Sequence, residues 1–147
     1  MRKRWAMALL LTVGMAGQAI AAGKLVVERG WIRAAPPGAM MLAGYASLRN
    51  AGAVPLAVTG ADSADFGAVS LHQSIEENGV ERMRPLGRID IAPGASVEFA
   101  PGGRHFMLMR PRRALNIGDM VKIHIATESG DGETAEFCVR EATPDAH

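Results

Sequence analysis

The sequence has few of the residues that would give it disulfide bonds, a strong charge or a helical core. Its one cysteine, Cys138, excludes an intramolecular disulfide. Basic and acidic side chains number 16 and 15, so the chain lacks the positive excess with which proteins bind nucleic acids. Long apolar repeats at spacings of three and four residues are also missing, which argues against a helical protein.

A continuous apolar segment occurs only near the N-terminus. Three basic residues at positions 2–4 precede an uncharged stretch, and residues 19–21 read Ala-Ile-Ala, the small-x-small form of a signal-peptidase site. The stretch is short and interrupted by glycine, so we interpret residues 1–21 as a cleaved secretory signal and not as a membrane span. Because no cysteine stands at the expected cleavage point, we expect no lipid anchor. Residues 22–147 are then expected to form one periplasmic domain with a short flexible C-terminal tail.

The rest of the chain alternates short apolar runs with turns rich in Pro, Gly and Asn, which is typical of an all-β protein. The alternation is clearest at Val121, Ile123 and Ile125, which are separated by single residues of the opposite face. The pattern predicts a Greek-key β-sandwich of the immunoglobulin-like or cupredoxin-like type. Strands are expected at residues 25–33, 44–49, 56–60, 68–75, 80–85, 96–99, 105–109, 120–127 and 134–140.

Four potential metal ligands have the spacing H-x10-M-x21-H-x-M, and they are His72, Met83, His105 and Met107. Thioether sulfur is soft and uncharged, so it suits Cu(I) and offers little to Zn²⁺, Ca²⁺ or Mg²⁺. A single methionine on a strand is more often a packing residue than a ligand. Together the four residues predict a site for one Cu(I) per chain, and because none needs an acid, base or nucleophile role, no enzyme is implied.

Local geometry favours the convergence of these side chains. Residues 78–79 are Asn-Gly, the strongest hairpin signal in the sequence, because both tolerate the positive φ of a type I′ turn. A two-residue loop there pairs Ser74 with Met83, which places His72 and Met83 on one face as diagonal neighbours. The other two ligands alternate along one strand and share a face, and Met109 lies on that face too.

The chain resembles the PCuAC-type periplasmic copper chaperones, whose hallmark is the same H-x10-M-x21-H-x-M pattern. The likeness extends to residues 82–85, 101–103 and 105–109, and to the segment 33–50 with its Pro-Pro-Gly. Gln73 is a departure, because many members carry Met directly after the first His. The resemblance implies a cupredoxin-like sandwich in which one Cu(I) is bound by His72, Met83, His105 and Met107.

The resemblance also implies a partner and a role. Family members hand copper to an acceptor protein, usually the CuA centre of cytochrome c oxidase subunit II, or take part in oxidase assembly through another chaperone. Apart from the resemblance, we expect a monomer, and the charge balance and the N-terminal segment predict no nucleic-acid partner and no membrane anchor in the mature chain.

Other functions remain open on the sequence alone. A blue-copper electron-transfer protein needs a Cys thiolate flanked by His and Met in the closing segment, but only His147 and no Met follows Cys138. An exported copper-storage or copper-tolerance protein is a further alternative. A metal-free sandwich that binds a protein or a glycan would leave the spacing of the four ligands unexplained. Cys138 itself, between Phe137 and Val139 in the last expected strand, is expected to be buried.

Overall fold

A computed structural model describes residues 23–142, and the expected signal segment and the end of the C-terminal tail lie outside these residues. Within them the chain forms strands and no helix, so the described part holds no helix that could cross a bilayer. The strands are β1 (Leu25–Arg33), β2 (Met41–Asn50), β3 (Leu56–Asp62), β4 (Phe66–Glu77), β5 (Val80–Pro85), β6 (Ile89–Ile91), β7 (Ser96–Phe99), β8 (Arg104–Pro111), β9 (Met120–Thr127) and β10 (Glu133–Arg140).

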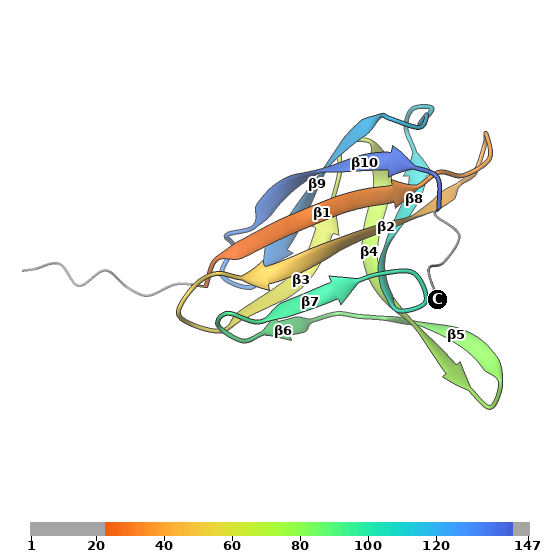
Figure 1. Cartoon of the computed structure of the whole chain (residues 1–147). Helices are drawn as coiled ribbons and strands as arrows, with labels where there is room; N and C mark the ends of the chain where they lie inside the picture. Colours follow the sequence, from red (N-terminus) through yellow and green to blue (C-terminus); the bar gives the residue numbers. More distant parts are fainter. Residues whose placement is uncertain (1–22, 143–147) are drawn as a thin grey trace, which may run out of the picture.

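The strands belong to one sheet that closes on itself (Figure 1). Hydrogen-bonded neighbours run in the order β5-β4-β8-β7-β2-β1-β10-β9-β3-β6, with further pairings of β4 with β3 and of β8 with β2. Passing from β4 through β8, β2, β1, β10, β9 and β3 returns to β4, so the sheet is barrel-like. The expected all-β class is confirmed in this form, and the finer assignment as a Greek-key sandwich stays a prediction.

Alternation along β8 decides which side chains face the interior. Phe106 and Leu108 are fully buried in the core. Phe106 stacks on Phe99 of β7, with ring centroids 4.5 Å apart, and meets the edge of Phe137 of β10 at 5.7 Å. Because neighbouring residues of a strand point to opposite faces, this anchoring turns His105, Met107 and Met109 to the outer face of the barrel.

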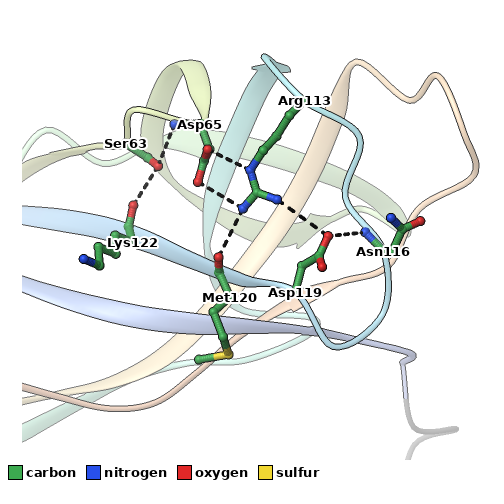
Figure 2. Close-up of polar contacts among 7 residues, drawn as sticks. All are labelled: Ser63, Asp65, Arg113, Asn116, Asp119, Met120 and Lys122. Atoms are coloured by element: carbon green, nitrogen blue, oxygen red, sulfur yellow. Dashed lines mark hydrogen bonds and ion pairs between the residues drawn. The ribbon is translucent and has the colours of Figure 1, made fainter.

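Polar contacts of Arg113 hold the connection between β8 and β9 against the turn between β3 and β4 (Figure 2). Nε and Nη2 of Arg113 donate to the two carboxylate oxygens of Asp65 at 2.8 and 3.3 Å. Nη2 also donates to the Met120 carbonyl at 3.1 Å, and Nη1 lies 3.6 Å from Asp119. The carboxylate of Asp119 in turn accepts the backbone N–H of Asn116 at 2.8 Å. These contacts therefore fix the C-terminal end of β8 through the connection that follows it.

Candidate metal centre

The pairing of β4 with β8 brings two imidazoles together. His72 lies directly opposite His105 in this antiparallel pair. Their ring centroids are 5.9 Å apart and the ring planes differ by 22°. His105 is only 6% exposed although it is on the outer face, because its neighbours cover it. The two histidines of the sequence pattern thus face each other across one strand boundary.

The predicted hairpin register places the first methionine beside this pair. Ser74 is opposite Met83, as the Asn-Gly turn predicted, and Asn78 and Gly79 have φ values of 53° and 75°. His72 is opposite Pro85, so Met83 is its diagonal neighbour, roughly 7–8 Å away at the backbone. Met83 is 57% exposed, because β5 is an outer strand of the sheet.

Met107 completes the set from the other side. It lies opposite Ser70, which is two residues before His72 on the same face of β4. The four candidate ligands therefore occupy one face of three adjacent strands, β5, β4 and β8. In this register the histidine pair lies between the two methionines. Met83 and Met107 are the most widely separated pair, because β4 lies between their strands. Their partners on β4, Ser74 and Ser70, are also four residues apart.

Hydrogen bonds determine which nitrogen of each ring could bind a metal. Nε2 of His72 lies 2.9 Å from the Ser70 hydroxyl, whereas its buried Nδ1 has no hydrogen-bond partner among residues 23–142. When Nε2–H donates to Ser70, Nδ1 keeps its lone pair. Nδ1 of His105 lies 3.4 Å from the Gly103 carbonyl, which can only accept, so that contact leaves Nε2 with its lone pair. Metal-binding histidines commonly donate their second N–H in this way.

Burial of His72 and the charge of a neighbouring imidazole both favour the neutral form of its ring. Burial, and to a smaller extent the nearby His105, lower the pKa of His72. The neutral imidazole is the form that binds a metal ion. A buried nitrogen without a partner is unfavourable in the free protein, and a bound ion would satisfy it. The residues present therefore fit a soft metal ion.

Other candidate residues are placed elsewhere. Gln73 pairs with Arg104 and Arg84, so it points to the face opposite His72, and a methionine at this position would not be directed at the site. Cys138 is half-buried and so only partly meets the expectation of burial; it lies on β10, opposite Trp31 of β1. Since β2 and β1 separate β10 from β8 in the ring, the described structure does not bring Cys138 to the histidine pair.

Sequence reasoning missed two supporting residues. Ser70 could have been found, because it shares the parity of His72 on the same strand. Gly103 had no such signal, since its carbonyl is placed by a backbone bond from the Ser74 N–H at 3.0 Å. Within residues 23–142, no three His, Cys, Asp or Glu side chains form a possible metal cluster. The candidate centre thus depends on the combination of imidazoles with thioethers.

Comparison with known proteins first defines the class. Residues 25–139 match the family model described as LpqE-like, putative lipoprotein LpqE-like, so the chain belongs to this family. The putative lipoprotein Lxx21020 of Leifsonia xyli subsp. xyli is 32% identical over 114 residues, which cover 77% of this chain and 66% of that protein. The uncharacterized protein RP573 of Rickettsia prowazekii is 37% identical over 59 residues, 40% of this chain and 33% of that protein. The chain spans less than two thirds of the length of both relatives.

Similar solved structures then identify which kind of domain this family contains. The copper-bound PCuAC domain from PmoF2 is 25% identical with a TM-score of 0.67, over 82% of this chain and 95% of that domain. The solution structure of Cu(I)-bound DR1885 from Deinococcus radiodurans is also 25% identical, with a TM-score of 0.60 over 85% of this chain and 83% of that one. The LpqE-like family is the PCuAC family, and the resemblance found in the sequence is confirmed.

Proposed function

We propose that this protein is an exported Cu(I) carrier that holds one ion with His72, Met83, His105 and Met107. The observation that carries the proposal is the buried Nδ1 of His72, which has no partner in the described part of the chain and belongs to a ring that faces His105 across β4 and β8. Two neutral imidazoles and two thioethers form a soft, uncharged set that favours Cu(I) over Zn²⁺. The copper-bound states of the PmoF2 domain and of DR1885 support this choice of metal.

The four ligands divide into a rigid pair and an adaptable pair. Each histidine has one ring nitrogen held, by Ser70 or by Gly103, so that the other can bind the ion. The methionines have flexible side chains, and Met83 is largely exposed on an outer strand. An acceptor can therefore displace the thioethers first, while the imidazoles still retain the ion. This order of exchange suits transfer to another protein better than permanent storage.

The acceptor we propose is a thiolate-rich copper protein outside the cytoplasm. Thiolates bind Cu(I) more strongly than neutral thioethers, so transfer to them is downhill. The CuA centre of cytochrome c oxidase subunit II, or an assembly chaperone that serves it, has the required chemistry. Export to the periplasm is supported by the basic and apolar N-terminal segment and by the lipoprotein description of the Leifsonia relative. The carrier acts as a monomer, and its function includes no catalytic step.

Anaerobic titration of residues 22–147 with Cu(I), in competition with a Cu(I) chelator, tests the site. We expect one tightly bound ion. The double variant Met83→Leu/Met107→Leu keeps similar side-chain volumes but should lose at least about 100-fold in affinity, or about 2.7 kcal/mol, since even residues that only support a ligand cost 10- to 100-fold. The matched control Met40→Leu/Met120→Leu changes two exposed methionines outside the four and should bind as the parent does. Parental affinity in the first variant would refute the site.

Transfer itself needs a separate measurement. Cu(I)-loaded protein is mixed with an apo CuA domain, and the rate at which the acceptor gains copper is compared with the rate of release to a chelator. Direct exchange of ligands predicts that the acceptor is loaded faster than free dissociation allows. Equal rates would mean that the protein releases copper to solution and does not deliver it.

A further inference from the structure

A second group of thioethers lies on the same outer face, next to Met107. Met41 of β2 is directly opposite Met109 of β8, and Ala43 is opposite Met107. On the other side of β8, Ala68 of β4 is opposite Met109. Residues paired across antiparallel strands point to the same face, so Met41, Met107 and Met109 all lie on the face that carries the histidine pair.

The spacing of these three residues suits one small ion. Paired Cα atoms of antiparallel strands are roughly 4.5–5.5 Å apart, which applies to Met41 and Met109. Met107 is two residues along β8 from Met109, a distance of roughly 7 Å. Three rotatable bonds allow each thioether to reach a common point above the sheet. The alanines opposite Met107 and Met109 are short, so they leave space over the strands for these longer side chains.

Exposure argues that packing alone does not explain this group. Met41 is 56% exposed and Met109 is partly buried. An exposed methionine contributes little to the core, which on β8 consists of Phe106 and Leu108 on the opposite face. Three methionines at neighbouring register positions therefore lie on one face of the sheet, and Met41 is exposed to solvent there.

We propose that Met41, Met107 and Met109 form an accessory Cu(I) site that exchanges its ion with the histidine site. This inference rests on the proposed function, because Met107 belongs to both sites. Thioethers alone are neutral and soft, so the accessory site selects Cu(I) and binds it more weakly than the site with two imidazoles. Cu(I) bound by Met41 and Met109 can gain Met107 and then His105 as the first two sulfurs leave. The ion keeps its oxidation state and no proton is transferred.

Methionine methyl groups provide a direct test for each residue. The chain of residues 22–147, labelled with ¹³C at the methionine methyls, is titrated anaerobically with Cu(I) and followed by NMR. The first equivalent should shift the signals of Met83 and Met107. Excess Cu(I) should then shift those of Met41 and Met109, the two accessory donors that the histidine site does not use. Met40 is the matched control, because it is 63% exposed and precedes β2. Signals of Met41 and Met109 that move no more than that of Met40 would overturn the accessory site.

Two variants separate this inference from the proposed function. In His72→Ala/His105→Ala, the signals of Met41 and Met109 should still respond to Cu(I), because their site needs no imidazole. In Met41→Leu/Met109→Leu, the first equivalent of Cu(I) should bind with parental affinity. The rate at which this variant takes Cu(I) from a weak chelator should fall several-fold, whereas Met40→Leu should load at the parental rate. Unchanged loading in the double variant contradicts the accessory site alone. Failure of Met83 and Met107 to shift at one equivalent contradicts the proposed carrier function.

Discussion

Substitution of Gly79 by alanine should weaken Cu(I) binding although the added methyl group would touch no candidate ligand. Gly79 has φ of 75° in the turn between β4 and β5, and no described atom lies within 4 Å of a Cβ built there. The only cost is therefore that of a side chain in the left-handed region, roughly 1–2 kcal/mol. All six residues of β5 are exposed, so this strain acts on the pairing of β5 with β4 and not on the core.

The effect on affinity follows from the position of Met83. The hairpin extends away from the barrel (Figure 1), and a two-stranded ribbon of this kind opens at low free energy. A strain of roughly 1–2 kcal/mol shifts the opening equilibrium by roughly 5- to 30-fold, which sets the upper limit of the loss in apparent affinity. The binding-competent hairpin is the one in which Ser74 is opposite Met83.

The assay combines chelator competition for Cu(I) with amide hydrogen exchange across β4 and β5. Gly94→Ala is the matched control, since Gly94 also has φ of 75° with no described atom within 4 Å of the added Cβ, but lies in the turn between β6 and β7. The control should lose stability and keep its affinity. If exchange shows that β5 is open in most Gly79→Ala molecules and binding is nevertheless parental, Met83 is not a ligand. If exchange is unchanged, the argument from backbone strain is wrong.

Further predictions concern pH, the core, the Arg113 contacts and the cysteine. The pKa of His72 is lowered in the folded protein, so the unfolded chain takes up a proton first as pH falls below ~6.5. The metal-free protein should therefore lose stability in this pH range. Urea unfolding of the parent and of His72→Gln at several pH values measures this loss. Phe106→Ala should cost about 3–5 kcal/mol in the same assay, because Phe106 is fully buried between two aromatic rings. Arg113→Ala should cost at most about 1 kcal/mol and speed amide exchange in residues 112–119, because its ion pair with Asp65 is partly solvated. Cys138→Ser should leave Cu(I) affinity in chelator competition unchanged, because β1 and β2 lie between β10 and β8 in the ring.

Local signals in the sequence predicted much of the fold. β1, β5, β7 and β9 begin and end at the expected residues, because turn residues mark where these segments begin or end. The strand Ile89–Ile91 was missed, since three residues are too few to show a period. This strand is stabilised by a residue distant in the sequence, the buried Asn50 of β2, whose Nδ2 donates to the Ile91 carbonyl at 3.0 Å. Closure of the sheet through β3 and β4 was also not predicted, because alternation within a strand does not say which strands become neighbours.

In the candidate site, too, local features could be predicted from the sequence and pairings between distant strands could not. The register that places Ser74 opposite Met83 is local, so the Asn-Gly turn predicted it correctly. The position of His105 opposite His72 depends on a pairing between strands that are distant in the sequence. Spacing identified the donor types, but only the assembled sheet brings the imidazoles together, and the ligand roles themselves stay a prediction.

The parallel pairing of β1 with β10 has a consequence for how the protein is made. The ring is joined by the first and last strands of the described chain, with Trp31 opposite Cys138, so folding cannot finish until the chain is nearly complete. Contacts between such distant strands form slowly. A chain that ends before β10 would leave β1 and β9 as open edges, which are prone to pair with other molecules. It would still carry β4, β5 and β8 with all four candidate donors, but no closed barrel would hold them in place.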